Sequence, residues 1–468
     1  MTLPELVGGR LADNTSDDPT RRAPLVLGGH NAVTLTEALC HPVESRPTSS
    51  LWYAAWIMAI LLLTVLAVTI GYVSIAGTGV LDNNQPIGWG LDMIIFVMWS
   101  GIGQGAVLFS AILFMFRQKW RIGIGRLAEM TGLSAICCTA LFATVSLCWP
   151  WSANWLGTIR GGTGTGLNFH SCQTWNLLFF GFFLIVSLTF ICAGLVPDLA
   201  TLYYRARTRR GKAIHGTLFT RWPMAELSRS RAQRIYEFSI LLAVPVGIVA
   251  ISMTGLVFAT SPLPGWHSLV FPPAFLATSL CGGLSMVTAM VLFVRRLFDL
   301  NEIITHRHIE NLNKAVLATS LMVLYARGAE LFATWWNVNP YEQFACLNQV
   351  EGTMMILYWI MIGCTTMVPQ LFWFKRLRTH MILTLVVAVI LHVGLWLDRY
   401  LFIVSPLNRD FLPWSWQDYI PGWVDLGMLA GGFGLFLALF LLFCRYLPVV
   451  SIDEITREMS ETQQEKPK

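Results

Sequence analysis

A few ionisable side chains stand inside otherwise apolar stretches of this chain, and they are the first candidates for chemistry. They are Glu129, His392 and the neighbours Arg327 and Glu330. If these stretches cross a bilayer, each charge costs about 2.5–3.5 kcal/mol on insertion scales, so a functional role is the default hypothesis. Carboxylates and imidazoles accept and release protons, and we therefore predict that Glu129, Glu330 and His392 belong to a sparse proton path. The alternative, that Glu330 and His392 are structural and Glu330 pairs with Arg327 three residues away, remains equally open.

Four further charged residues stand near the ends of the apolar stretches. A charge at such a position can anchor a helix at a membrane surface without any role in chemistry. We favour this interpretation for Asp92, Asp398, Arg399 and Asp425.

The elements that position these residues are apolar segments long enough to cross a membrane. Hydrophobic residues make up 55% of the 468-residue chain and charged residues only 13%, against roughly 25% charged residues in a soluble domain. This composition excludes a disordered chain, a secreted disulfide-rich domain and an ordinary cytosolic enzyme. About 20 apolar residues in a helix cover a hydrocarbon core of ~30 Å. Ten such segments are expected, at residues 53–73, 89–116, 127–148, 173–197, 236–259, 268–294, 314–336, 352–374, 381–404 and 424–444. The predicted fold class is an all-α integral membrane protein.

The basic residues alternate between the two ends of these segments. Of the 32 Lys and Arg residues, all but Arg160, Arg327, Arg399 and Arg409 fall in the termini or in every second connection. The positive-inside rule then places both termini in the cytoplasm. We expect a polar cytoplasmic tail at residues 1–50, a transmembrane domain at residues 51–446 and a cytoplasmic tail at residues 447–468. We expect membrane lipid, and no nucleic acid, as a partner.

The cysteines and histidines argue against a redox centre in this chain. The ten cysteines form no C-x-x-C or C-x-x-C-H motif, so no iron–sulfur cluster and no c-type haem is expected. A membrane haem needs two facing histidines, and His392 is the only histidine well inside a segment. No metal site is predicted.

Several segments resemble the NrfD/polysulfide-reductase membrane-subunit family, and within it most closely the quinol-oxidising membrane subunit of alternative complex III. The segments that carry the resemblance include DNNQPIGWGLDMIIFVMWSGIGQG (82–105), PGWHSLVFPPAF (264–275), YWIMIGCTTMVPQLFWFK (358–375) and WLDRYLFIVSPLNRDFLPWSW (396–416). The resemblance implies ten helices, with two four-helix bundles plus flanking helices, in a bacterial inner (plasma) membrane. It also implies an iron–sulfur subunit docked on the outer face, a quinone or menaquinol bound between helices near that face, and a second NrfD-like membrane subunit in the same complex.

The sequence departs from the family at the positions that the resemblance assigns to the quinol. Quinol-oxidising members carry His or Asp where this chain has Gln104, Ser146, Asn176 and Val257. Serine, amide and valine side chains cannot accept the protons of a quinol at neutral pH. His170, six residues before Asn176, is a candidate replacement for the missing histidine.

Three functions therefore stay open. The first is a membrane subunit of a respiratory quinol-linked oxidoreductase that anchors the iron–sulfur subunit and handles quinol and protons. The second is a non-catalytic structural paralogue whose quinol site is lost, so that enzymatic activity of this chain itself is uncertain. The third is a ten-span secondary transporter, which would require paired broken helices; Pro245 has no good counterpart four segments later.

Overall fold

The computed structural model describes residue 40 and residues 49–83, 87–148, 169–205, 229–261, 263–337, 339–409 and 413–456. Every regular element in these ranges is a helix. Ten of the helical segments are long and apolar enough to cross a membrane, which confirms the predicted fold class. Nine are α3 (Ser50–Ala76), α4 (Leu91–Met115), α5 (Gly125–Cys148), α6 (Cys172–Arg205), α8 (Arg229–Ala259), α9 (Phe271–Leu297), α10 (His306–Trp336), α14 (Met381–Asn408) and α15 (Trp423–Tyr446).

The remaining span, residues 355–373, changes its helical type twice along its length. It begins as α12 (Met355–Ile362), widens to a π-helical turn, η5 (Gly363–Met367), and tightens to a 3-10 helix, η6 (Val368–Trp373). Pro369 lacks an N–H and obstructs a regular α-helix at this point. A short helix, α11 (Pro340–Val350), precedes this span, and another, α13 (Lys375–Arg378), follows it.

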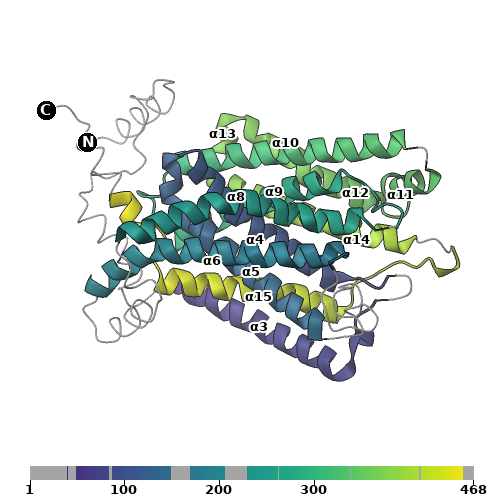
Figure 1. Cartoon of the computed structure of the whole chain (residues 1–468), viewed down its shortest axis with the longest axis horizontal. Helices are drawn as coiled ribbons and strands as arrows, with labels where there is room; N and C mark the ends of the chain where they lie inside the picture. Colours follow the sequence, from purple (N-terminus) through teal and green to yellow (C-terminus); the bar gives the residue numbers. More distant parts are fainter. Residues whose placement is uncertain are drawn as a thin grey trace.

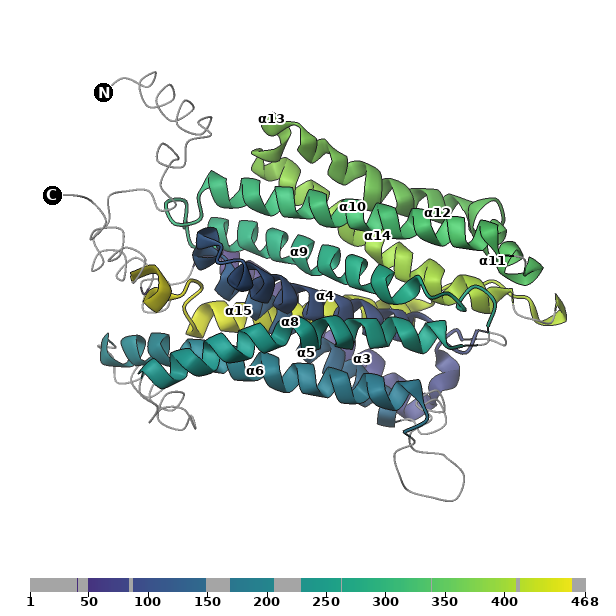
Figure 2. The ribbon, with the colours of Figure 1, turned by 45° about the horizontal axis from the view of Figure 1, so that its top comes forward.

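The long helices run side by side in two groups (Figures 1 and 2). One group contains α4, α5, α6 and α8, and the other contains α9, α10, α14 and the span that begins with α12. Helices α3 and α15 pack on each other, and α15 contacts α4 and α5. This arrangement fits the two four-helix bundles with flanking helices that the resemblance implied.

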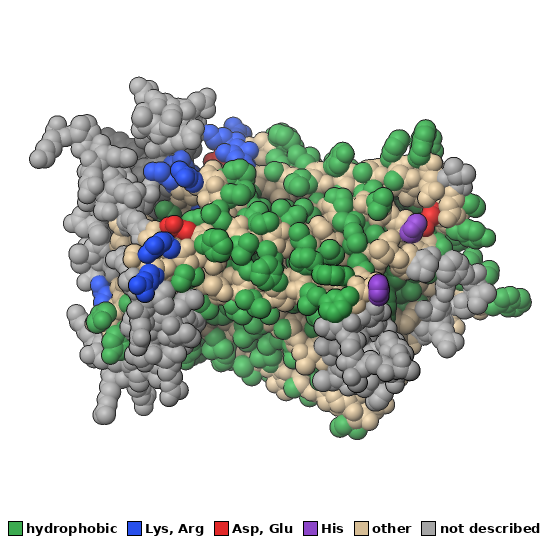
Figure 3. Space-filling model, viewed as in Figure 1, with side chains coloured by type: hydrophobic (Ala, Val, Ile, Leu, Met, Phe, Trp, Pro, Cys, Tyr) green, Lys and Arg blue, Asp and Glu red, His purple; other side chains and the backbone are tan. Residues whose placement is uncertain are grey.

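The two ends of the helix stack differ in composition. We call the end that carries Arg121, Arg126, Arg295, Arg296, Arg378 and Arg445 the basic end. We call the opposite end, which carries Trp89, Trp266, Trp335, Trp336, Trp414 and Trp423, the aromatic end. Figure 3 shows Lys and Arg gathered at one end and hydrophobic side chains over the flank between the ends, as expected of a membrane protein.

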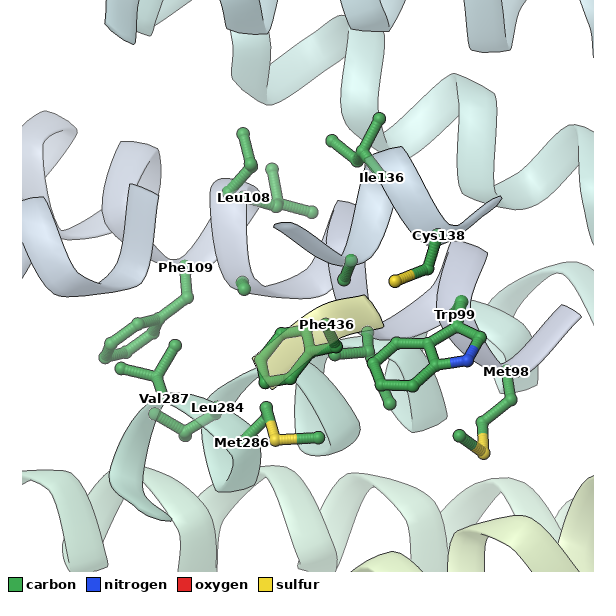
Figure 4. Close-up of a cluster of buried hydrophobic side chains, with 14 of the residues drawn as sticks. Met98, Trp99, Leu108, Phe109, Ile136, Cys138, Leu284, Met286, Val287 and Phe436 are labelled. Carbon is green, nitrogen blue, oxygen red and sulfur yellow. The ribbon is translucent and has the colours of Figure 1, made fainter. Parts of the chain in front are cut away.

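The two groups meet where α4 crosses α9, and glycine is required at this crossing. A Cβ atom on Gly105 would lie 1.9 Å from the carbonyl oxygen of Ser279, and one on Gly283 would lie 2.2 Å from the amide nitrogen of Ala106. The backbones therefore approach too closely for any side chain. Beside this crossing, Trp99 of α4 stacks on Phe436 of α15 with ring centroids 5.1 Å apart (Figure 4).

The chain after α15 folds back onto the basic end. Residues 447–468 were expected to form a polar tail, but within residues 447–456 the side chains of Leu447, Val449, Val450, Ile452 and Ile455 are buried in the core. Most of residues 1–50, the predicted N-terminal tail, lie outside the described residues.

Candidate functional site

Arg327 joins two carboxylates inside the second group of helices. Its Nη1 lies 2.5 Å from Oε2 of Glu330, three residues along α10, and its Nη2 donates to Oδ1 of Asp398 on α14. The predicted pairing of Arg327 with Glu330 is therefore confirmed. Asp398 is 1% exposed, so its interpretation as a surface anchor was wrong.

Arg399 is also buried, although it was expected at the membrane surface. Its Nη2 donates to the hydroxyl of Thr278 on α9, and its guanidinium lies 4.0 Å from the ring centroid of Phe275. Its Nε is 3.8 Å from Oδ2 of Asp398. The predicted segment ended at residue 404, whereas α14 continues to Asn408. Arg399 consequently lies ~14 Å from that helix end, at ~1.5 Å per residue.

His392 lies two turns before Arg399 on α14, and it forms a hydrogen bond with a residue of α9. Its Nδ1 is 2.9 Å from Oγ of Ser285 and 2.9 Å from the carbonyl oxygen of Ala388. A void of about 20 Å³ touches both His392 and Arg399 and is also lined by Thr278. Roughly 10–15 Å³ of such space holds one water molecule. This void, large enough for one water molecule, adjoins both His392 and Arg399.

The other side of His392 opens onto a large apolar groove in the flank. We call this space of about 1100 Å³ the flank groove; it lies between α3, α4, α9, α14 and α15. Its lining includes Met98, Met286, Phe293, Leu385, Val389, Trp396, Phe433 and Phe436. Met98, Met286 and Phe436 are drawn among the core side chains in Figure 4.

A second small void continues the polar series toward the aromatic end. It measures about 30 Å³ and is lined by Arg327, Glu330, Glu342, Cys346 and Tyr358. Glu342 of α11 accepts a hydrogen bond of 2.9 Å from the amide of Gly265 at the aromatic end. Two groups of polar side chains, each bordering one of the two small voids, thus lie between the flank groove and the aromatic end. We call the series His392, Ser285, Thr278, Arg399, Asp398, Arg327 and Glu330 the polar relay.

Glu129 belongs to a separate cluster at the basic end. It accepts hydrogen bonds from Arg126 at 3.1 Å, from Tyr236 at 3.2 Å and from Ser110 at 3.4 Å. Arg126 also donates to Asp198 at 2.9 Å and to the carbonyl oxygen of Gly194 at 2.8 Å. The cluster ties the starts of α5 and α8 to the end of α6.

The segment after α15 completes this cluster. Oδ1 of Asp198 accepts hydrogen bonds of 3.1 and 3.2 Å from the amides of Ile452 and Asp453. Arg121 lies 2.7 Å from Glu454. Burial opposes the charge on Arg121, but the neighbouring Tyr236, Glu454 and Glu129 outweigh it and raise the pKa of Arg121. Arg121, Tyr236, Asp453 and Glu454 line a cavity of about 650 Å³ at the basic end.

Two other predicted anchors, Asp92 and Asp425, do lie in the first turns of their helices at the aromatic end. Asp425 is nevertheless 1% exposed. The hydroxyl of Tyr419 donates to Asp425 at 2.8 Å and accepts from the amide of Leu91 at 2.9 Å. Burial raises the pKa of Tyr419 far above its ordinary value.

The positions that the resemblance assigned to the quinol are only partly brought together. Asn176 of α6 accepts a hydrogen bond of 3.1 Å from Thr254 of α8, and Val257 stands one turn beyond Thr254. His170 is exposed just before α6. Ser146 is in the last turn of α5, but its side chain lies outside the described residues.

Gln104 is placed apart from this group. It lies ~20 Å along α4 from the aromatic end, at ~1.5 Å per residue, and donates to Ser100 at 3.1 Å. Asn176 is only ~6 Å into α6.

The sequence reasoning missed the partners of these charges. The predicted segments begin at residue 127 and end at residue 197, so Arg126 was counted in a basic connection and Asp198 fell just outside its segment. The spacing of Arg126 and Glu129, three apart on a helix, could have revealed their pairing. Nothing in the sequence around Thr278 and Ser285 marks them as partners of Arg399 and His392.

Two comparisons with known proteins agree with the helical architecture. Residues 79–408 match the model of the family described as polysulphide reductase, NrfD. Over 286 residues the chain is 22% identical to a putative dimethyl sulfoxide reductase membrane subunit of Halobacterium salinarum. The aligned part covers 60% of this chain and 60% of that relative. The closer resemblance to alternative complex III stays a prediction.

The family match spans all of the polar relay, Glu129 and the α4–α9 crossing. It accounts for well over half of the chain. This protein is therefore a member of the NrfD polysulphide reductase family.

Proposed function

We propose that this chain is the membrane subunit of a quinol-linked oxidoreductase complex and that His392 is where a quinol loses its protons. The observation that carries the proposal is the polar relay, which begins at the flank groove and leads to the aromatic end. Oxidation of one quinol to quinone releases two protons and two electrons. The protons pass into the relay, and the electrons pass to a partner subunit that holds a redox centre.

The flank groove suits the quinol end of such a reaction. Met98, Trp396 and Phe433 supply apolar surface near His392 for a ring and its hydrocarbon tail. A neutral imidazole accepts a proton from a hydroxyl within hydrogen-bond reach. Nδ1 of His392 lies 2.9 Å from both Oγ of Ser285 and the carbonyl oxygen of Ala388, whereas Nε2 is 3.5 Å from Oγ of Ser285. Because Nε2 has the weaker contact, it is the nitrogen that we propose to receive the substrate proton.

The next part of the relay can carry that proton away. A water in the void between His392 and Arg399 would accept it and would be oriented by Thr278. Asp398 then offers a carboxylate, and Glu330 a second one beyond Arg327. This path places the acid–base chemistry in the second group of helices, away from Ser146, Asn176 and Val257. Glu129 lies in a separate cluster at the basic end, and its role in proton exchange with that side of the membrane stays a prediction.

The aromatic end is the docking face that we propose for an iron–sulfur subunit. Trp414 is fully exposed there, and Trp335 and Trp336 are 71% and 72% exposed. Large aromatic side chains are enriched at protein interfaces. In this orientation the basic end faces the cytoplasm, as the positive-inside rule predicts.

A specific observation also supports the second candidate, a non-catalytic structural subunit. Asn176, at a position where quinol-oxidising members carry an acid, accepts a hydrogen bond from Thr254 and so joins α6 to α8. Under this alternative, the residues at the altered positions serve helix packing instead of quinol chemistry.

Quinol oxidation by the purified complex distinguishes the two candidates. If His392 is the general base, His392→Asn lowers the rate by a factor of about 10²–10⁴, the usual range for loss of such a group. The matched control is Ser146→His with Val257→Asp, which rebuilds the family positions and leaves His392 in place. An inactive wild-type complex that this double variant activates would establish the structural subunit. Unchanged activity of His392→Asn would remove His392 from the reaction.

A further inference from the structure

Arg295 is a buried cation at the basic end of the flank groove, and it has no carboxylate partner among the residues that the structure describes. It stands in the last turn of α9, lines the groove, and is 6% exposed. Its Nη1 is directed at the sulfur of Met381, a weak acceptor. Its Nε is buried and has no hydrogen-bond partner within the described part of the chain.

No carboxylate in the described ranges lies within 4.0 Å of the Arg295 guanidinium. The opposite charge that acts on it is Asp299, an exposed residue that accepts a hydrogen bond from Asn301. Arg296, its neighbour, is exposed to solvent. Burying an unpaired cation is costly, so the site around Arg295 favours an anion.

The walls of the groove are apolar, so they suit an anion that carries hydrocarbon. Ile382, Leu385 and Val389 line the groove from one face of α14, and Phe293 lines it from α9. From Met381 to His392 the groove follows α14 for ~16 Å, about half of a ~30 Å hydrocarbon core. This basic half of the groove therefore has the depth of one lipid leaflet.

We propose that the basic half of the flank groove is a binding site for an anionic phospholipid. Its phosphate contacts Arg295 and Arg296, and one acyl chain lies along Ile382, Leu385 and Val389 toward His392. A guanidinium binds phosphate through its forked N–H donors, and Arg295 lines the groove from which such a phosphate would approach. Free phosphate would leave the apolar walls without a ligand. A quinone would leave Arg295 without an anion.

The test uses the full chain, within its complex, purified in mild detergent and stripped of lipid. The probes are vesicle-forming phosphatidylglycerol, phosphatidylcholine with the same acyl chains, and inorganic phosphate. Retained phospholipid is counted by mass spectrometry, and the melting temperature is followed by tryptophan fluorescence. We expect phosphatidylglycerol to bind and to raise the melting temperature, and phosphatidylcholine and phosphate to do neither.

Two variants and one control identify the site. Arg295→Gln should weaken phosphatidylglycerol binding about tenfold or more, the effect of losing a charge-assisted contact. Leu385→Trp, which fills the groove and keeps Arg295, should also reduce binding. Arg376→Gln changes an exposed arginine of the same end, on α13, and should bind like the wild type.

Other occupants would overturn the proposal. Equal binding of phosphatidylcholine would show an unspecific lipid contact, and a response to phosphate alone would show a soluble anion site. Recovery of quinone instead of phospholipid would assign the whole groove to the quinol. If phosphatidylglycerol binds only after residues 1–44 are deleted, the N-terminal residues of the chain cover the groove. The lipid measurements need no quinol turnover, so they can fail without affecting the proposed function.

Discussion

Replacing Arg126 by methionine should destabilise the protein severely. In the wild type this guanidinium donates to Glu129, to Asp198 and to the carbonyl oxygen of Gly194, at 3.1, 2.9 and 2.8 Å. Glu129 and Asp198 are 1% and 0% exposed. Removing one partner of a buried ion pair costs about 3–5 kcal/mol, because the other charge is left buried and uncompensated. Arg126→Met keeps an unbranched apolar side chain, so loss of the charge dominates.

A second substitution tests the cause of this loss. When Arg126→Met is combined with Asp198→Asn, one uncompensated carboxylate is gone, while the amide oxygen of the introduced asparagine can still accept from the amides of Ile452 and Asp453. We expect the double variant to recover about 1–3 kcal/mol, the cost of an unsatisfied buried polar group.

Unfolding in dodecyl maltoside micelles, followed by tryptophan fluorescence, measures these free energies. Arg376→Met is the control, since substitution of an exposed residue should change the free energy of unfolding by no more than about 0.5 kcal/mol. The reasoning is refuted if Arg126→Met stays within that margin. It is also refuted if Asp198→Asn lowers the stability of Arg126→Met further.

Two other predictions concern packing and the aromatic end. Gly105→Ala should lower the free energy of unfolding by about 1–3 kcal/mol or more, because its Cβ would collide with the Ser279 carbonyl. The control is Gly328→Ala, whose Cβ would meet nothing within 4 Å and which should be neutral or slightly stabilising. Equal melting temperatures of the two variants would contradict the close crossing. Tyr419→Phe should cost about 1–3 kcal/mol, because Asp425 and the amide of Leu91 each lose a buried partner. Since burial raises the pKa of Tyr419 in the folded state, the stability advantage of the wild type should be constant below about pH 10, the ordinary tyrosine value, and shrink above it. An advantage that grows with pH, in melting curves of both proteins, would be inconsistent with this burial.

Hydropathy was sufficient to predict the ten spans, because a helix in lipid must satisfy its backbone internally and present apolar side chains outward. The ends of the spans were less certain, and this had consequences for the site. The apolar run of the ninth segment stops at residue 404, one turn before the helix ends, and this places Asp398 and Arg399 misleadingly close to the membrane surface. Asp198 stands one residue beyond the predicted segment 173–197, whereas its helix, α6, continues to Arg205.

The groove and the polar relay could not be predicted from one sequence. The relay exists because Ser285 and Thr278 of α9 face His392 and Arg399 of α14. This contact depends on the rotation of α9 and α14 about their own axes. The contact of Gly105 with Ser279 fixes α9 only against α4. Nothing in the local pattern around His392 encodes the rotation of α14.

The fold-back of residues 447–456 affects how the protein is made. Arg126, Glu129 and Asp198 belong to early helices, yet two donors to Asp198 come from the backbone of Ile452 and Asp453. During translation these charges enter the membrane before those donors exist. The basic end can therefore close only after all ten spans have been synthesised, and a ribosome that stalls within the last span would release a chain with a buried carboxylate short of partners.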